Sequence, residues 1–531
     1  MKLEQSYDVV IVGYGAAGAA AAIEAADAGA RVLVLDRGYG GGASTLSGGV
    51  VYAGGGTPYQ KAAGLQDSPE NMFNYLRQEV KGFVSDATLR RFCETSPAMI
   101  AWLERQGAQY RGTLCPYKTS YPTDAHYLYY SGNEKAWPYK LEAEPAARGH
   151  RQVAKGMSSG HVFFEALRRS AAAKGVEFKP LSRVHELIIE NRAVVGVRYR
   201  TMELSGPARR QHQRLSQLAG KLGNWVPPAG GKLNAKAEAL WQVNATEAEA
   251  RATSVILSGG GFVFNPEMKA RYDGGFKDIS PLGTVGDDGT VINLGVSAGG
   301  TTDHLERMTA WRFMSPPSAL LEGVTVGPAG TRIANEDRYG ATHSQVMIDE
   351  HGGRGYLVLD ANSWTKARRQ IRSQTLTFQR AMAAYLFTIG HKKAGTLAGL
   401  AAKIGVPADA LAQTVAAYND GIHSGAGDPH HKASDLCSPV EQGPFFAIDI
   451  SIKNSPAYPA PGLTLGGLRV SEETGQVLSG EDEPIDGLYA AGRTAVGICS
   501  NGYISGLSLA DCIFSGRRAG VHAATKSPVT A

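Results

Sequence analysis

Apolar positions near the amino terminus occur in blocks that predict a strand, a turn, a helix and a second strand. Residues 9–12 form a continuous apolar run, residues 13–18 are rich in glycine, and an alanine-rich stretch extends to about Ala28. A second strand is predicted over residues 31–35 and ends at Asp36. Short apolar runs bounded by glycine are typical of buried strands, whereas the longer alanine-rich stretch favours a helix. The chain therefore begins with a β–α–β unit.

The turn in this unit has the G-x-G-x-x-G spacing of a dinucleotide-binding loop. Gly13 permits the tight turn, Gly15 lets backbone amides approach a pyrophosphate at the helix N-terminus, and Gly18 lets helix and strand pack closely. Asp36 would accept hydrogen bonds from the adenosine ribose; an ordinary strand-end carboxylate is the alternative. The predicted cofactor contacts of this unit are Gly13, Gly15, Ala16, Ala17, Gly18, Asp36 and Arg37.

Two later segments have the pattern of further strands in the same sheet. Residues 254–257 form a buried-strand run that ends in glycines, and residues 487–493 form another, followed by a helix over about 508–523. A single-cofactor nucleotide module would not need to return at the far carboxyl end. FAD-binding domains are commonly assembled from sequence-distant pieces, so the pattern predicts an α/β fold with a Rossmann-like FAD-binding domain. The predicted cofactor contacts here are Gly259, Gly260, Gly492, Arg493, Ser508 and Leu509.

The middle of the chain then has to form a second domain inserted into the first. We predict an FAD-binding domain from residues 1–286 and 440–531, and an inserted α+β catalytic (capping) domain from residues 287–439. The elements predicted in the inserted domain are an extended segment over 355–360 and helices over 396–404 and 408–418.

Residues 203–250 differ in composition from their surroundings. Four basic residues, Arg209, Arg210, Arg214 and Lys221, accompany an apolar stripe of Leu215, Leu218, Ala219 and Leu222, with Trp225 shortly after. A basic amphipathic helix near a tryptophan can lie on a membrane surface. An excursion between two strands that packs its stripe on the protein itself is the preferred interpretation. Either way, the segment is expected to be a peripheral insertion.

Composition narrows the function further. The chain has 531 residues and a formal net charge of +5, which is too small to indicate a nucleic-acid binder. Five scattered cysteines without a C-x-x-C pair predict neither a disulfide framework nor a metal site. The amino terminus lacks a signal-peptide pattern and no apolar run is long enough to span a bilayer, so a cytoplasmic protein is expected, with contact to the inner face of a membrane through residues 203–250 as the alternative.

Several motifs together resemble the flavin family of fumarate reductases and 3-ketosteroid dehydrogenases. They are the glycine turn with Asp36, the loop 41–49, the strand 255–261, the segment 332–336, the pair Gly466 and Gly467, and the carboxyl-terminal block. The resemblance covers nearly the whole chain apart from residues 203–250. It implies FAD held without a covalent bond, and it adds Ser44, Thr45, Ser47, Gly48 and Gly49 to the expected cofactor contacts.

The resemblance also bears on the substrate. The fumarate enzymes carry a histidine at the place of Leu463 and a dicarboxylate-binding arginine at the place of Tyr503. Their second arginine, the proposed proton donor, would fall near Gly340, beside Tyr339. A site that loses cations and gains phenols is poorly suited to a dianion. The turn 502–506 looks like that of the 3-ketosteroid Δ4-(5α)-dehydrogenases, whereas the tyrosine-proline-glycine turn of the Δ1-dehydrogenases is missing. This implies catalytic roles for Tyr503, Ser505 and the turn residue Gly506.

The chemistry can be argued separately from the family. Dehydrogenation beside a ketone needs a base for the α-hydrogen, a donor for the enolate oxygen and a hydride acceptor. Tyr503 is the expected base, Ser505 the hydroxyl that supports it, and Tyr339 the third active-site hydroxyl. A tyrosine cluster is expected either to line a flat, apolar substrate cavity or to pack as an ordinary loop; its members are Tyr121, Tyr127, Tyr129 and Tyr130.

The preferred function is therefore Δ4-(5α)-dehydrogenation of a steroid-like substrate in bacterial steroid degradation, with electrons passed to a separate acceptor. Three alternatives stay open: Δ1-dehydrogenation of a similar ketosteroid, reduction of a polar enoate such as fumarate or urocanate, and a flavin-binding electron carrier without its own substrate. The long insertion that carries Tyr339 speaks against the electron carrier.

Overall fold

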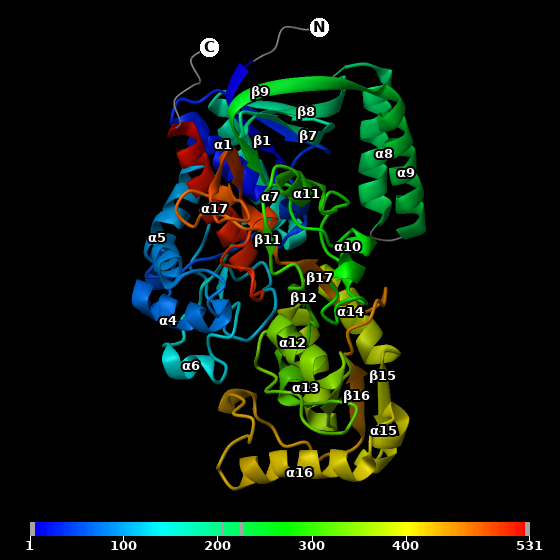
Figure 1. Ribbon diagram of the computed structural model, residues 1–531. Coiled ribbons are helices and arrows are strands. Elements are labelled where there is room, and N and C mark those ends of the chain that lie inside the picture. The colour runs from blue at the N-terminus through cyan, green and yellow to red at the C-terminus, as the bar shows by residue number, and fades with distance from the viewer. Residues whose placement is uncertain (1–5, 204, 224–226, 526–531) are drawn as a thin grey trace.

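The predicted β–α–β unit forms the centre of the largest sheet in the computed structural model, which describes residues 6–203, 205–223 and 227–525 (Figure 1). Strand β1 (Ser6–Val12) pairs in parallel with β2 (Val32–Asp36), and helix α1 (Ala16–Asp27) connects them. The side chains of Val9, Val10 and Ile11 are fully buried. The predicted strand, turn, helix and second strand are therefore confirmed.

The main sheet is assembled from distant parts of the chain. Its strand order is β19-β20-β9-β1-β2-β6, with β8 pairing antiparallel to β9 and β7 to β8. Strands β20, β9, β1, β2 and β6 run parallel, so the carboxyl ends of the central strands meet at one edge. The added strands are β6 (Glu177–Pro180), β7 (Ser182–Glu190), β8 (Ala193–Met202), β9 (Ala245–Leu257), β19 (Gln476–Leu478) and β20 (Pro484–Ala490).

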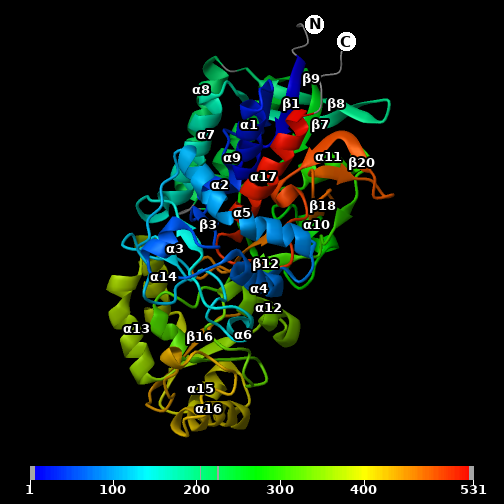
Figure 2. The same ribbon diagram turned by 90° about the vertical axis from the view of Figure 1, so that its left-hand side faces the viewer.

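Helix α17 (Leu507–Thr525) packs against α1 on one face of this sheet, as the turned view shows (Figure 2). The two backbones approach closely at two glycines. A β-carbon at Gly516 would lie 2.4 Å from the Ala17 carbonyl oxygen, and one at Gly520 would lie 2.4 Å from that of Ala21. The carboxyl-terminal block is thus an integral layer of the domain that the amino terminus begins.

Strands β7, β8 and β9 pair side by side, and the connection from β8 to β9 consists of two helices. These are α8 (Pro207–Gly223) and α9 (Pro227–Asn244), which pack side by side (Figure 1). The predicted excursion between two strands is therefore a helical hairpin. Ala219 is buried, whereas Leu218 in the predicted stripe is 48% exposed. Trp225 lies outside the described residues.

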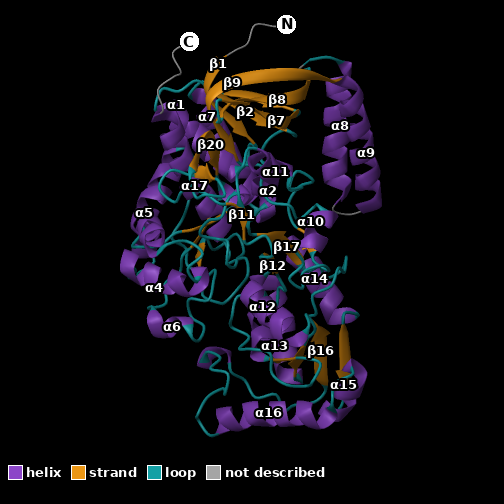
Figure 3. Cartoon of the chain, in the orientation of Figure 1, coloured by secondary structure: helices purple, strands orange, loops and turns teal. Residues whose placement is uncertain are grey.

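A second, four-stranded antiparallel sheet lies at the far end of the molecule from the termini (Figure 3). Its order is β13-β14-β16-β15. The extended segment predicted over 355–360 and both predicted helices are confirmed as β14, α15 and α16. Strand β16 belongs to this sheet although it follows residue 439, the predicted end of the inserted domain. The bounds are β13 (Val324–Val326), α12 (Gly340–His351), β14 (Tyr356–Leu359), α13 (Ala361–Gln374), α14 (Thr377–Thr388), β15 (His391–Ala394), α15 (Leu397–Ile404), α16 (Ala408–His423) and β16 (Phe445–Asp449).

The remaining strands are short, and the remaining helices have between 4 and 20 residues. The strands form one two-stranded and two three-stranded sheets. No helix in the described part of the chain combines the length and apolarity needed to cross a bilayer. The remaining elements are α2 (Gly42–Leu46), β3 (Val50–Tyr52), α3 (Pro58–Ala62), α4 (Pro69–Val80), α5 (Asp86–Arg105), β4 (Leu128–Tyr129), α6 (Tyr139–Glu142), β5 (Gly149–Arg151), α7 (Ser159–Ala173), α10 (Pro266–Arg271), β10 (Ser280–Pro281), α11 (Thr290–Ser297), β11 (Thr302–Asp303), β12 (Met308–Ala310), β17 (Pro461–Thr464) and β18 (Gly467–Leu468).

Candidate active site

One cavity of about 1320 Å³ connects the glycine turn after β1 with the region between the two sheets. All four expected catalytic residues line it: Tyr339, Tyr503, Ser505 and Gly506. The expected cofactor residues on its wall are Gly13, Gly15, Ala16, Ala17, Asp36, Arg37, Ser44, Ser47, Gly48, Gly259, Gly260, Gly492, Arg493, Ser508 and Leu509.

Three expected cofactor residues do not line the cavity. Gly18 sits inside α1, where a β-carbon would lie 2.1 Å from the Gly13 carbonyl oxygen. The Thr45 hydroxyl donates within its own helix to the Gly42 carbonyl at 2.9 Å. Gly49 has a φ of +60° and packs against the backbone of Ser159. These residues shape the loops that line the cavity.

The glycine turn leaves the start of α1 open toward the cavity. Gly13 has a φ of +103°, a left-handed conformation that favours glycine, and no side chain caps α1 at Gly15. The Ser44 hydroxyl accepts a hydrogen bond from the Ala16 amide at 2.9 Å. Asp36 accepts hydrogen bonds from two backbone amides, at 2.8 and 2.7 Å, which fixes its carboxylate at the end of β2. A helix N-terminus with its amides facing a cavity is suited to a phosphate group.

Arg493 brings a cation to the same cavity. It forms an ion pair with Asp287, and its Nη1 atom is buried without a hydrogen-bond partner among the described residues. A buried donor without a partner is costly, so a ligand oxygen at this place would stabilise it. A dinucleotide that carries phosphates and a polar ring system fits the open helix N-terminus, the fixed carboxylate and this guanidinium.

Three aromatic side chains, two of them phenols, meet at the other end of the cavity. The Trp311 indole Nε1 donates a hydrogen bond to the Tyr339 hydroxyl at 2.9 Å, and the Trp311 ring stands edge-on to Tyr503 with 4.4 Å between centroids. The Tyr339 and Tyr503 rings are 6.3 Å apart. Leu463 and Phe313 belong to the same apolar cluster. The residues around Tyr503 thus form an apolar chamber with phenolic groups. Its lining residue Trp311 has no local sequence signal and was not predicted.

The turn that carries Ser505 is held from behind by residues of the predicted tyrosine cluster region. The Ser505 Oγ atom lies 2.8 Å from the Tyr129 hydroxyl, and its carbonyl accepts a hydrogen bond from the Ser131 hydroxyl at 2.9 Å. No hydrogen bond joins Ser505 to Tyr503 within the described chain. Of the four clustered tyrosines, Tyr121 lines the cavity, whereas Tyr129 is fully buried behind the turn. The cluster therefore serves both cavity wall and packing.

The local environment affects the acidity of these phenols. Burial raises the pKa of Tyr503 above its ordinary value, while the Gly506 backbone amide and Arg493 act to lower it. Burial likewise raises the pKa of Tyr339, which Trp311 and Ser505 oppose through hydrogen bonds. Both phenols are protonated at neutral pH in this environment. Arg493 is the cation that favours the Tyr503 phenolate.

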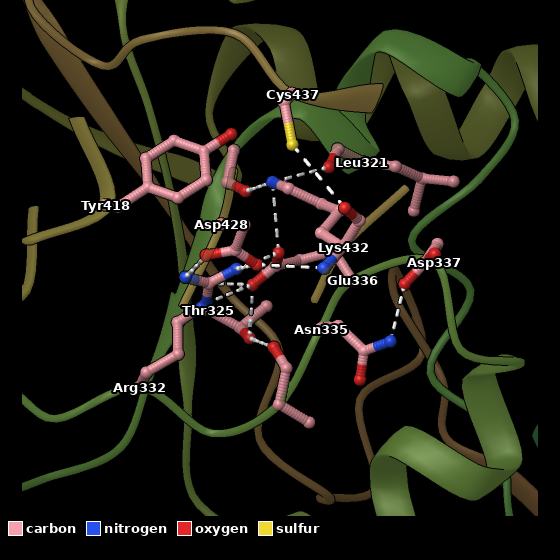
Figure 4. A network of polar contacts seen from close by, with 12 residues as sticks. Leu321, Thr325, Arg332, Asn335, Glu336, Asp337, Tyr418, Asp428, Lys432 and Cys437 are labelled. Atoms are coloured by element: carbon pink, nitrogen blue, oxygen red, sulfur yellow. Dashed lines mark hydrogen bonds and ion pairs between the residues drawn. The ribbon is translucent and has the colours of Figure 1, made fainter. Parts of the chain in front are cut away.

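A buried network of charges fixes the loop that leads to Tyr339 (Figure 4). Glu336 is completely buried and holds Arg332 at 2.6 Å and Lys432 at 3.1 Å, and Arg332 also contacts Asp428 at 3.1 Å. The charged neighbours keep the pKa of Glu336 well below its ordinary value despite its burial. Removing one partner of such a group leaves an uncompensated buried charge. The predicted motif 332–336 thus anchors the segment before Tyr339.

Comparisons with known proteins agree with this fold and cavity, which define a dinucleotide-binding protein. The family model described as FAD binding domain matches residues 8–506. The chain is 39% identical over 498 residues to 3-oxo-5-alpha-steroid 4-dehydrogenase of Comamonas testosteroni, which covers 91% of this chain and 92% of the relative. The chain belongs to the FAD-binding flavoprotein family, and the expected cofactor, FAD, is confirmed.

Two solved structures are similar over nearly the whole chain. The 3-ketosteroid-delta4-(5alpha)-dehydrogenase of Rhodococcus jostii, in complex with 4-androstene-3,17-dione, has a TM-score of 0.82 at 30% identity and covers 99% of both chains. The 3-ketosteroid delta1-dehydrogenase of Sterolibacterium denitrificans has a TM-score of 0.68 at 19% identity and covers 98% of this chain and all of that one. The second likeness shows the fold alone. The predicted α/β fold and the predicted family are confirmed.

Proposed function

We propose that this protein is an FAD-dependent dehydrogenase that introduces the Δ4 double bond into a 5α-3-ketosteroid. The observation that carries the proposal is the meeting of Tyr503, Tyr339 and Ser505 at the apolar end of a cavity whose other end holds a dinucleotide-binding turn. Phenols and apolar walls suit a flat, neutral ketone. The relatives described as Δ4-dehydrogenases, at 39% and 30% identity, support the same substrate class.

The chain's residues would share the work of breaking two C–H bonds. The hydrogen beside the ketone leaves as a proton, which Tyr503 accepts as its phenolate. The electron pair of that bond forms the new C=C bond as the neighbouring hydrogen leaves with its pair as a hydride. Bound FAD supplies the hydride acceptor. The two electrons then pass to a separate acceptor.

Three further residues support the base in this proposal. Tyr339 accepts a hydrogen bond from Trp311, so its own proton is available for the ketone oxygen or for the proton path. Ser505 lies between Tyr339 and the buried Tyr129, and this hydroxyl sequence can pass a proton away from the substrate. Gly506, with a φ of +94°, gives the turn a conformation that favours glycine and brings its amide to Tyr503.

Anaerobic mixing of the FAD-loaded protein with three substrates tests the proposal. We expect a saturated 5α-3-ketosteroid to bleach the flavin, and a 4-ene-3-ketosteroid to leave it oxidised. The matched 3β-hydroxy steroid is the control, because without the ketone its hydrogen is not acidic. Bleaching by the 4-ene-3-ketosteroid would instead indicate Δ1-dehydrogenation. Reoxidation of the reduced flavin by fumarate, with no response to steroids, would indicate an enoate reductase.

A further inference from the structure

The helical hairpin formed by α8 and α9 docks on the loop that follows β2. His212 on α8 lies 3.0 Å from the Tyr39 hydroxyl, and Glu238 on α9 accepts two hydrogen bonds from Arg183, both at 2.7 Å. Trp241 is buried, and its indole donates to the Leu181 carbonyl at 2.9 Å. These contacts join the hairpin to the main sheet at the end that holds Asp36.

The docked hairpin supplies one wall of the cavity. Its lining residues come from both helices and lie in the same cavity as Asp36, Arg37 and Tyr39. Arg37 is also close enough to contribute to the low pKa of Glu238. The expected peripheral insertion therefore reaches the cofactor end of the cavity. The lining residues of the hairpin are His212, Ser216, Asn234, Ala235, Ala237, Glu238, Trp241 and Gln242.

We propose that this hairpin completes the adenosine half of the FAD site. Asp36 marks that half, because an acidic residue at the end of the second strand binds the ribose in this type of fold. The pyrophosphate belongs at the N-terminus of α1. Asp36 accepts hydrogen bonds from Tyr14 in the glycine turn and from Gly38 in the loop on which the hairpin docks, so it joins the two parts of the cavity wall. The part of FAD that extends beyond the pyrophosphate toward Asp36, the ribose and adenine, is the part that the hairpin covers.

The side chains on this wall have the chemistry that adenosine needs. Adenine is neutral and offers both hydrogen-bond donors and acceptors, and Ser216, Asn234 and Gln242 provide uncharged groups of both kinds. Burial lowers the pKa of His212, so its ring is neutral and can donate, accept or stack. Arg183 holds the pKa of Glu238 at about 2, which leaves an ionised carboxylate in this wall of the cavity.

The sheet register permits a clean removal of the hairpin. Met202 in β8 pairs directly with Ala245 in β9, so a two-residue Asn-Gly turn can replace residues 203–244 and join the two strands. FAD and FMN are then titrated into the apoprotein of the parent and of this variant. We expect the Kd for FAD to rise about tenfold or more. The Kd for FMN, which lacks the adenosine, should change little.

An unchanged Kd for FAD, or an equal loss for FAD and FMN, would overturn the proposal. Cosedimentation of the parent but not of the variant with phosphatidylglycerol vesicles, with equal FAD affinities, would assign the hairpin to a membrane surface instead. If the shortened protein does not fold, His212→Ala decides the question by the same FAD and FMN titrations. Arg210→Ala, an exposed position on the same helix, is the matched control.

Discussion

The indole of Trp311 donates its hydrogen bond to the Tyr339 hydroxyl, and this fixes the direction in which the phenol can act. An indole N–H is only a donor, so Tyr339 must accept at this contact and direct its own proton elsewhere. Trp311→Phe keeps the apolar wall but frees the phenol. We expect slower flavin reduction by substrate, by roughly tenfold, because an unoriented donor stabilises the enolate oxygen less well.

Stopped-flow flavin reduction checks this, with Tyr339→Phe measured beside it. If the two residues act as a unit, the double variant should be little slower than Tyr339→Phe alone. Additive losses would contradict the shared role. Both single variants should retain bound FAD, since neither change removes a cofactor contact.

Tyr503→Phe tests the proposed base. The ring stays in place beside Trp311, so FAD should remain bound while its reduction slows by about 10² to 10⁴-fold. Ser505→Ala should slow flavin reduction less than Tyr503→Phe does. Because burial raises the pKa of Tyr503, the parent's reduction rate should increase between about pH 7 and pH 10, and this increase should be missing in Tyr503→Phe. A Tyr503→Phe rate within about threefold of the parent would exclude Tyr503 as the base.

Replacing Gly15 or Gly18 by alanine distinguishes a role in cofactor binding from a role in packing. A β-carbon at Gly15 would meet only the Ser44 Oγ atom at 3.5 Å, whereas one at Gly18 would lie 2.1 Å from the Gly13 carbonyl oxygen. Gly15→Ala should therefore fold normally and bind FAD more weakly, because the methyl group faces the pyrophosphate position. Gly18→Ala should lower the melting temperature even of the apoprotein. Equal melting temperatures for the two apoproteins would contradict this division.

The buried carboxyl group of Glu79 should make the free energy of unfolding depend on pH. It accepts hydrogen bonds from Tyr75 and Asn133, and burial raises its pKa from 4.5 to about 7. The folded state favours the protonated acid. The contribution of Glu79 to the free energy of unfolding is therefore fully present below about pH 4.5 and is lost as the pH rises to about 7. Glu79→Gln cannot ionise, so it should avoid up to about 3 kcal/mol of this decrease in the free energy of unfolding.

Urea unfolding at several pH values measures this difference. The free energy of unfolding of Glu79→Gln minus that of the parent should increase between pH 5 and pH 8, on the order of the shift described above. Glu70→Gln, which alters an exposed ion pair with Arg90, is the control and should show no such trend. A flat difference for Glu79→Gln would mean that the carboxyl is not neutral in the folded protein.

Helices and strands could be predicted from the sequence where the pattern that specifies them lies within one segment. The apolar run before Gly13 and the alanine-rich stretch after it predicted β1 and α1, because burial and backbone freedom act within that segment. Helix α9 was not predicted, since its first residues are Pro227, Pro228 and two glycines and its amphipathic pattern is weak. The position of α9 depends on the contacts of Trp241 and Glu238 with Leu181 and Arg183, which are distant in the sequence.

In the candidate site, too, residues of one turn could be predicted from the sequence, whereas their partners from distant segments could not. Tyr503 and Ser505 share one turn and could be proposed from their spacing, and all four expected catalytic residues line the cavity. The partners of these groups come from elsewhere: Trp311 precedes the inserted sheet, and Tyr129 lies far upstream. Spacing suggested that Ser505 supports Tyr503 directly, but its hydroxyl contacts Tyr129. Which hydroxyl meets which is decided by packing between distant segments.

The close packing of α17 on α1 also sets the order of events during protein synthesis. Ala17 and Ala21 emerge from the ribosome early, but the glycines that cover them, Gly516 and Gly520, emerge only after most of the chain has been made. Until then the part of α1 that α17 covers lacks this partner, although α7 can already pack against α1, and β20 is missing from the sheet. Because Arg493, Ser508 and Leu509, which line the cavity, also lie in this last part of the chain, the cofactor site is complete only once synthesis is nearly finished.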